Sequence, residues 1–197
     1  MAKTIIFDMD GVLVHLDWEQ VCAPLAGLSP KNAASVRREV VNGPIVKTAM
    51  TGQVGPEEFH AALCERLEIE LPYQDFLRIW VRLLRANGEI VPLVERLKPV
   101  HSLVLASNTD PIHYTYSDQH FEVLGHFEQR FLSYELGLLK PEPTFFRHVL
   151  GSLGVEADDC VFIDDSLENV ESARGVGMIA LHFTGYQNLQ SSLTAIL

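Results

Sequence analysis

Residues 4–11, Thr-Ile-Ile-Phe-Asp-Met-Asp-Gly, join a short, mostly apolar run to two aspartates. The run Thr4–Phe7 offers no polar face, which is typical of a buried strand in a parallel sheet. Asp8 and Asp10 follow at the carboxyl end of that strand, where open parallel sheets gather their ligands. Gly11 allows a close backbone turn whose N–H can point at an anion. This stretch therefore predicts an α/β fold with a site directly after its first strand.

Further apolar runs predict the rest of the sheet. Three are clear, and a fourth is weaker: Leu103–Ala106, Cys160–Ile163 and Ile179–Phe183, with Arg130–Tyr134 as the weaker one. Apolar residues at helical spacing predict helices between them, over Pro143–Leu153 and Ser166–Val176. Alternating strands and helices predict a Rossmann-like parallel sheet flanked by helices.

The segment 15–90 has a different pattern. Two stretches within it carry apolar residues at helical spacing, namely Phe59, Ala62, Leu63 and Leu67, and then Tyr73, Phe76, Leu77, Trp80, Leu83 and Leu84. No part of the segment is predicted as a strand. We therefore expect a helical cap at 15–90, inserted into a sheet domain formed by 1–14 and 91–197. Short connectors near 14–17 and 86–91 are expected to act as hinges.

The composition restricts the class of partner. The 197 residues are 47% hydrophobic and 21% charged, with a net charge of −11. A nucleic-acid binder would show a basic surface, so we expect no nucleic-acid partner. No apolar run approaches the roughly 20 residues of a membrane span, and the N-terminal residues do not resemble a signal peptide. With three cysteines and no CxxC pair, we expect reduced thiols in a cytoplasmic protein. The sequence leaves the oligomeric state open.

Chemically active side chains follow the predicted strands. In chain order they are Asp8 and Asp10, Ser107 and Asn108, Lys140, and then Asp164 and Asp165. Each motif alone has a structural explanation as a turn, a helix cap or a surface lysine. Together they should meet at one sheet edge, where carboxylates repel one another unless a cation is present. Hard oxygen ligands suit Mg²⁺, and the lysine and serine then suit a phosphoryl group.

These motifs resemble those of a known superfamily. Asp8-Met9-Asp10-Gly11-Val12, Ser107-Asn108, Lys140-Pro141 and Asp164-Asp165 are similar to the four ordered motifs of the haloacid dehalogenase superfamily, across essentially the whole chain. Phe162-Ile163-Asp164-Asp165 with Asn169, and Ser107-Asn108-Thr109 with His113, resemble one branch of it. That branch holds glucose-1-phosphate-type phosphatases and the phosphatase domain of soluble epoxide hydrolase. The resemblance implies a magnesium-dependent phosphohydrolase that acts on a small phosphorylated metabolite through an aspartyl-phosphate.

The resemblance also implies a role for each motif residue. Asp8 would be the nucleophile and a magnesium ligand. Asp10 would be the general acid and base, with its backbone carbonyl on the metal. Asp165 would be the third ligand, and Asp164 would sit beside the metal or reach it through water. The phosphoryl group would be bound by Gly11, Ser107, Asn108 and Lys140, and the lysine would also keep the nucleophile ionised.

Other readings and residues remain open. A hydrolytic haloacid dehalogenase and a phosphosugar mutase would use the same scaffold, as would a non-catalytic binding domain. A dehalogenase usually replaces the second aspartate with an aromatic residue, and this chain retains Asp10. Asn169 is a candidate partner of the acid pair, and His113 is expected on a helix near the pocket. His15 and Trp18 are expected to pack in the core or at an interface. The substrate stays open, with a sugar phosphate as the default by analogy.

Overall fold

The computed structural model describes residues 3–197, so the first two residues of the expected segment 1–14 lie outside the described part. Its main sheet has five parallel strands in the order β5-β4-β1-β6-β7. The strands are β1 (Thr4–Phe7), β4 (Ser102–Ser107), β5 (Gln129–Leu132), β6 (Cys160–Asp164) and β7 (Ile179–His182). The predicted α/β class with a parallel sheet is confirmed.

Some strand boundaries differ from the predicted ones. β4 and β6 continue one residue further at their carboxyl ends, so Ser107 and Asp164 are the last residues of their strands. β5 ends earlier than predicted, because Ser133 already begins the short helix α8 (Ser133–Leu136). The motif residues nevertheless leave the sheet at its carboxyl edge, as the sequence predicted.

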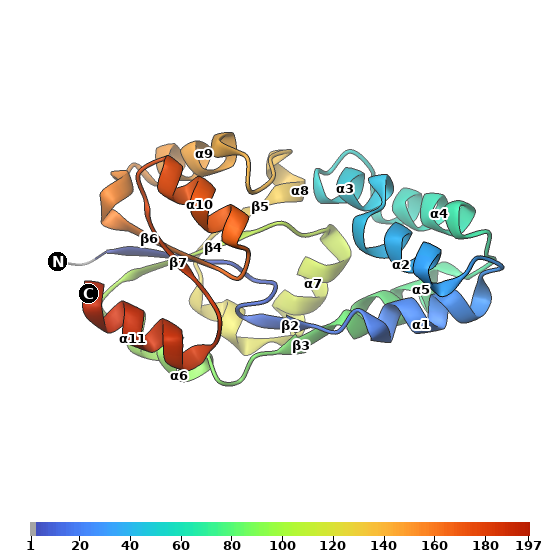
Figure 1. Cartoon of the computed structure of the whole chain (residues 1–197), viewed down its shortest axis with the longest axis horizontal. Helices are drawn as coiled ribbons and strands as arrows, with labels where there is room; N and C mark the ends of the chain where they lie inside the picture. The colour runs from blue at the N-terminus through green and yellow to red at the C-terminus, as the bar shows by residue number, and fades with distance from the viewer. Residues whose placement is uncertain (1–2) are drawn as a thin grey trace.

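Helices cover both faces of the sheet (Figure 1). One face carries α9 (Pro143–Leu153) and α10 (Leu167–Gly175), and the other carries α6 (Val91–Leu97) and α11 (Tyr186–Ile196). Side chains of β1 alternate between the two layers: Ile6 packs in the cluster that includes α9 and α10, and Ile5 and Phe7 pack in the other. The chain also forms α7 (Pro111–His120) and the 3₁₀ turns η2 (Glu122–His126) and η3 (Ala157–Asp159). The central strand is therefore buried on both faces, which holds the site rigidly.

The ends of the helices follow from their sequences. α9 begins with Pro143 and ends at Leu153. The next residue, Gly154, caps the helix with a φ of 66°, a left-handed conformation that glycine adopts readily. α10 begins after Ser166, whose side chain accepts a hydrogen bond from the N–H of Asn169. This cap matters for function because it sets the start of the helix that carries Asn169 toward β6.

The predicted insertion forms a separate group of helices, at the end of the molecule away from both termini (Figure 1). Its helices are α1 (Glu19–Leu28), α2 (Ala33–Asn42), α3 (Pro44–Met50), α4 (Pro56–Leu67) and α5 (Tyr73–Trp80). Its interior holds three aromatic rings. Phe59 lies edge-on to Phe76 and to Trp80, with centroid separations of 5.9 and 5.1 Å, and Phe76 stacks on Trp80 at 5.4 Å.

The expectation that 15–90 contains only helices is wrong at both ends. Val14–Leu16 (β2) and Leu84–Ala86 (β3) pair as a two-stranded antiparallel ribbon. α5 accordingly ends at Trp80, and a 3₁₀ turn, η1 (Val81–Leu83), leads into β3. The apolar spacing that predicted a longer helix through Leu84 reflects burial alone. A strand of three residues has too little pattern of its own to be recognised, and it forms here because a distant segment supplies its partner.

The insertion also touches the sheet domain at the loop between α3 and α4. Gly52 has a φ of 68°, and a Cβ atom on it would lie 2.0 Å from the carbonyl oxygen of Tyr134 in α8. Only glycine therefore permits this approach. The insertion is thus seated on the domain at a second place besides the ribbon.

Two expectations from composition can be compared with the structure. The three cysteines, Cys22, Cys64 and Cys160, are free thiols, and the first and last are buried. Among residues 3–197, no helix is both long and apolar enough to cross a membrane. The longest of them, α4, has 12 residues.

Candidate active site

Asp8 lies at the centre of the sheet's carboxyl edge, because β1 is the middle strand. Its side chain is buried, with 5% of the residue exposed. Oδ1 accepts hydrogen bonds from the N–H of Met9 and from the Lys140 ammonium, both at 2.7 Å. Within residues 3–197, no donor contacts the other carboxylate oxygen. One oxygen is therefore fixed by the protein, and the second is free to react.

Lys140 joins two of the predicted carboxylates. Its Nζ lies 2.7 Å from Asp8 Oδ1, 2.7 Å from Asp164 Oδ2, and 3.0 Å from the carbonyl oxygen of Ala106. Burial opposes its charge, but the two carboxylates outweigh this and raise the lysine pKa above its ordinary value. Burial raises the pKa of Asp8, and the ammonium counteracts that effect. Lys140 is thus a buried, charged ammonium that favours the ionised form of the nucleophile.

Asn108 holds the backbone of Lys140 in place. Its Nδ2 donates to the lysine carbonyl at 2.7 Å, and its Oδ1 accepts from the lysine N–H at 2.9 Å. This pair of bonds links two segments that are 32 residues apart. The predicted contact of Asn108 with a phosphoryl group stays a prediction, and the Asn108 side chain has one amide N–H left to make it.

Unlike the Asn108 side chain, the Ser107 side chain makes no hydrogen bond within the described chain. It is fully buried. A buried polar atom without a partner costs free energy, so it points to a group that binds there. An anionic oxygen would accept this hydrogen bond, which supports the predicted phosphoryl contact.

Asp164 is fully buried and already well supplied with donors. It accepts from the amide Nδ2 of Asn169 at 3.0 and 3.1 Å, from the N–H of Ser166 at 2.8 Å, and from Lys140. The predicted proximity of Asn169 to the acid pair is therefore present in the structure. Asp165, by contrast, is exposed. The carboxylate of Asp165 is therefore more available to bind a metal ion than that of Asp164.

The carboxylates form a group that suits a divalent cation. One oxygen each from Asp8, Asp164 and Asp165 lies within 4.8 Å of the others. These are hard oxygen donors, and the group has an exposed side where water and a phosphate oxygen can complete the coordination. The residues present therefore fit Mg²⁺.

Gly11 does not have the role predicted for it. Its N–H donates to the carbonyl oxygen of Val14 at 2.7 Å, so the predicted contact of this N–H with a phosphoryl oxygen is wrong for this structure. This hydrogen bond lies within the turn that follows β1 and stabilises it. Gly11 instead makes room: its φ is 84°, and a Cβ atom would lie 2.0 Å from Oδ2 of Asp165.

Replacing Gly11 with alanine should therefore displace Asp165. We expect about 10–100-fold weaker Mg²⁺ binding, because shifting a metal ligand has effects of that size. The measurement is the Mg²⁺ concentration that half-saturates the rise in melting temperature. The matched control is Gly151→Ala in α9, where a Cβ meets nothing within 4 Å. Equal Mg²⁺ affinity in both variants would show that Asp165 is not a ligand.

Asp10 has the properties of an acid–base group. Its Oδ1 is buried and has no hydrogen-bond partner within the described residues. Burial raises its pKa to about 6, with His113 as the main opposing charge. A carboxyl group with this pKa can both donate and accept a proton near neutral pH.

Some contributors to the site escaped the sequence reasoning. The hydroxyl of Ser133 accepts from the N–H of Thr109 at 3.0 Å and donates to its carbonyl at 3.1 Å, which steadies the segment after β4. A lone serine carries no signal for this. Asp110 caps α7, and the pair Asp110-Pro111 was a readable helix start. Trp18 packs against the core as expected, but His15 is exposed, because it lies on the outer face of β2.

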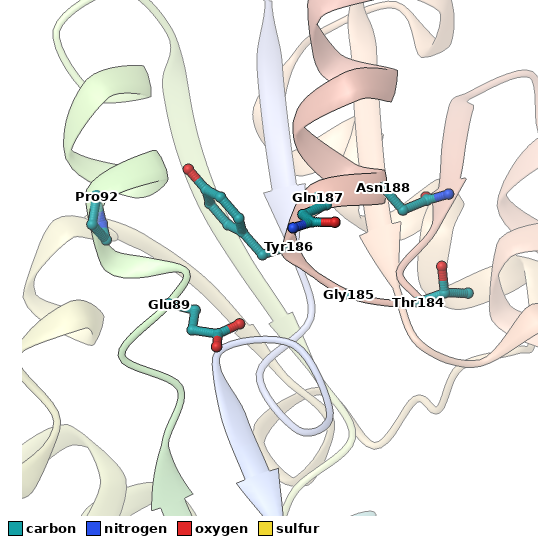
Figure 2. A pocket seen from close by; sticks show the side chains of 7 residues that line it. All are labelled: Glu89, Pro92, Thr184, Gly185, Tyr186, Gln187 and Asn188. Carbon is teal, nitrogen blue, oxygen red and sulfur yellow. The ribbon is translucent and has the colours of Figure 1, made fainter.

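A separate surface pocket of about 670 Å³ lies between the start of α6 and the start of α11 (Figure 2). Tyr186 and Gln187 face it from one side, and Glu89 and Pro92 from the other. None of the motif residues lines it. Its one charged side chain is a carboxylate, which disfavours an anion. The pocket therefore does not compete with the strand-end site for a phosphate.

Comparison with known proteins agrees with this geometry. The model of the haloacid dehalogenase-like hydrolase family matches residues 2–177. The chain therefore belongs to the haloacid dehalogenase-like hydrolases, as the resemblance in its motifs predicted.

Two relatives that match nearly the whole chain are named as phosphatases. The chain is 28% identical to sesquiterpene phosphatase of Aspergillus oryzae, over 92% of this chain and 90% of that protein. It is 22% identical to D-ribitol-5-phosphate phosphatase of Bacteroides thetaiotaomicron, over 100% and 99%. A family enzyme of B. thetaiotaomicron, solved with magnesium and inorganic phosphate, superposes with a TM-score of 0.84 at 25% identity, covering 92% of this chain and 94% of that one. The chain is thus a phosphatase of this family.

Proposed function

We propose that the protein is a magnesium-dependent phosphatase that hydrolyses a small phosphorylated metabolite through an aspartyl-phosphate on Asp8. The observation that carries the proposal is the nucleophile itself. Asp8 has one oxygen held by Lys140 and by the N–H of Met9, and the other free. A buried lysine that pairs with a carboxylate favours the anion that attacks.

The reaction has two steps, the formation and the hydrolysis of the aspartyl-phosphate, and side chains of the site carry out both. The free oxygen of Asp8 attacks phosphorus, the bond to the leaving oxygen breaks, and Asp10 gives that oxygen a proton. Asp10 then removes a proton from water, water attacks the aspartyl-phosphate, and inorganic phosphate leaves with Asp8 restored. Ser107 donates a hydrogen bond to a phosphoryl oxygen. The three N–H groups of Lys140 face Asp8, Asp164 and the Ala106 carbonyl, so the ammonium acts on the phosphoryl group through its charge.

Magnesium would be held by Asp8, Asp165 and the backbone carbonyl of Asp10, with Asp164 beside it. Bound there, it would neutralise charge on the phosphate and on the carboxylates. Asp164 already accepts from three donors, which supports an indirect role for it.

Two observations favour the phosphatase over a dehalogenase. A halide leaving group needs no proton, whereas an alkoxide does, and Asp10 supplies an acid with a pKa of about 6. Ser107 also presents a buried, unpartnered hydroxyl that fits a phosphoryl oxygen. A phosphosugar mutase shares both features, so a product analysis for free phosphate separates it from the phosphatase.

We further propose that residues 15–90 act as a cap over the site and that the β2–β3 ribbon connects the cap to the domain. The leaving group would lie between cap and sheet edge, so the cap would select it. One relative is named for a sesquiterpene and another for D-ribitol 5-phosphate. A panel should therefore contain both terpenoid phosphates and polyol or sugar phosphates.

The proposal predicts strict magnesium dependence. Hydrolysis of an aryl phosphate should vanish with chelator and return with Mg²⁺, because the carboxylates repel an anionic phosphate when no cation is present. The melting temperature should also rise with Mg²⁺ in the absence of substrate. Chelator saturated beforehand with Mg²⁺ is the control. Full activity in chelator, with halide release from a haloacid, would contradict the proposal and favour the dehalogenase.

A further inference from the structure

His113 in α7 is buried against the cap and has both ring nitrogens engaged. It is 3% exposed, and its neighbours Asp110 and Trp80 are each 1% exposed. Nδ1 lies 2.9 Å from Oδ2 of Asp110, and Nε2 lies 3.0 Å from the carbonyl oxygen of Trp80. The imidazole ring is stacked on the Trp80 indole, with centroids 5.0 Å apart and planes 2° from parallel. Trp80 belongs to the cap, so these contacts cross from the cap to the sheet domain.

The partners determine the protonation of the ring. A carbonyl oxygen only accepts, so Nε2 must carry a hydrogen. Asp110 accepts from the N–H of Ile112 and of His113 at 2.8 and 3.0 Å, and from the Trp80 indole at 3.2 Å. With three donors pointing at it, the carboxyl group is ionised, and Nδ1 must therefore donate as well. A ring with two N–H groups is an imidazolium.

We propose that His113 is a permanently protonated positioning residue that fastens the cap to the acid–base side of the active site. It links the end of α5 to the first turn of α7, and this helix begins at Pro111, three residues after Asn108. The charge of His113 also lowers the pKa of Asp10, in the turn after β1. The charge of His113 thus acts on three elements whose relative positions the reaction depends on: the end of α5, the first turn of α7 and the turn after β1.

The surroundings of the ring support a fixed charge. The ionisable groups that act on it are Asp110, on its own helix, and Asp10, from the turn after β1, and both are acidic. From the cap, α5 contributes the Trp80 carbonyl and indole rather than a charge. Burial alone would favour the neutral ring, but the carboxylates and the hydrogen bonds raise the pKa of His113. The indole face adds an attraction to a cation.

The first experiment uses the wild-type protein and needs no activity. Nitrogen-15 and carbon-13 NMR of the histidine rings should show His113 as an imidazolium throughout the range from pH 5.5 to 8.5. In Asp110→Asn, the amide keeps the backbone contacts but removes the charge, and His113 should then titrate. A neutral His113 ring at pH 7.5 in the wild-type protein would overturn the proposal.

The second experiment compares His113→Gln with the exposed control His148→Gln. Hydrogen exchange should accelerate in Tyr73–Leu83 and at the start of α7, with the sheet unchanged. A glutamine carries both of its N–H donors on one nitrogen, so it does not reproduce the contacts that His113 makes through two separate ring nitrogens. An equal increase across the whole chain, or no change anywhere, would reduce His113 to an ordinary core residue and overturn the proposal.

The kinetic measurement rests on the proposed function, and the two measurements above do not. kcat on an alkyl phosphate should fall about tenfold or more in His113→Gln, because small displacements of reacting groups have effects up to about 10²-fold. Inhibition by inorganic phosphate should stay within about threefold, since Ser107 and Lys140 are untouched. An unchanged kcat alongside the expected NMR and exchange results would overturn the positioning role alone. A wild-type protein without phosphatase activity would instead contradict the proposed function.

Discussion

Replacing Asp8 with asparagine is expected to abolish turnover while leaving the fold intact. An amide does not attack phosphorus at a useful rate, so no aspartyl-phosphate forms. Lys140 keeps a partner, because its ammonium also contacts Asp164 at 2.7 Å. Asparagine can still accept from the N–H of Met9 through its own oxygen. The variant therefore removes the nucleophile without removing the frame around it.

In the absence of metal, Asp8→Asn is expected not to lower the stability of the folded protein. Burial raises the pKa of Asp8 in the folded state, so its ionised form is destabilising at neutral pH when no metal is bound. The amide removes that cost. In chelator, the melting temperature of Asp8→Asn should equal or exceed that of the wild-type protein, and added Mg²⁺ should raise it less.

The measurement is steady-state hydrolysis of an aryl phosphate, with exposed Asp158→Asn as the matched control. Residual activity above about a hundredth of the wild-type value would contradict covalent catalysis by Asp8. General acid–base assistance alone contributes about 10²–10⁴, so a smaller loss would leave Asp8 in an auxiliary role.

Asp10→Asn should separate the two half-reactions. Asp8 still attacks phosphorus, and the backbone carbonyl of residue 10 is unchanged. What is lost is the proton for the leaving oxygen and, later, the base for water. Nitrophenolate leaves without a proton, whereas an alkoxide does not. The variant should release about one equivalent of nitrophenol in a burst and then stall as the aspartyl-phosphate. With a sugar or terpenoid phosphate, even the burst should be slow.

The pH dependence gives an independent check on Asp10. Its pKa is raised to about 6, so the protonated acid is present below that pH and is lost as the pH rises through it. kcat/KM of the wild-type enzyme on an alkyl phosphate should therefore decline above about pH 6. The decline should be absent in Asp10→Asn. If the variant turned over aryl and alkyl substrates in the wild-type ratio, the acid–base role would pass to another group or to solvent.

Much of the site could be predicted because its signals are local. Asp8, Ser107 and Asp164 each stand at the end of a buried apolar run, and the ends of parallel strands converge. That reasoning brought the four motifs to one edge, as the structure has them. It went wrong for Gly11, because the hydrogen bond from its N–H to Val14 belongs to a turn whose shape the residue letters do not specify. It missed the β2–β3 ribbon, since a strand of three residues exists only through its distant partner.

By itself, the sequence determined the class of fold, the order of the motifs and the types of group at the site, because apolar spacing and strand-end residues are properties of neighbouring positions. Only the tertiary structure decided which hydrogen-bond and ion-pair partners each of those groups has. Asn108 donates to the backbone carbonyl of Lys140, and the Lys140 ammonium contacts both Asp8 and Asp164. The proposed charge of His113 depends on its contacts with Asp110 and with the carbonyl oxygen of Trp80. These contacts mostly join segments that lie far apart along the chain. A hydrogen bond depends on distance and direction in space, and the spacing of letters carries neither.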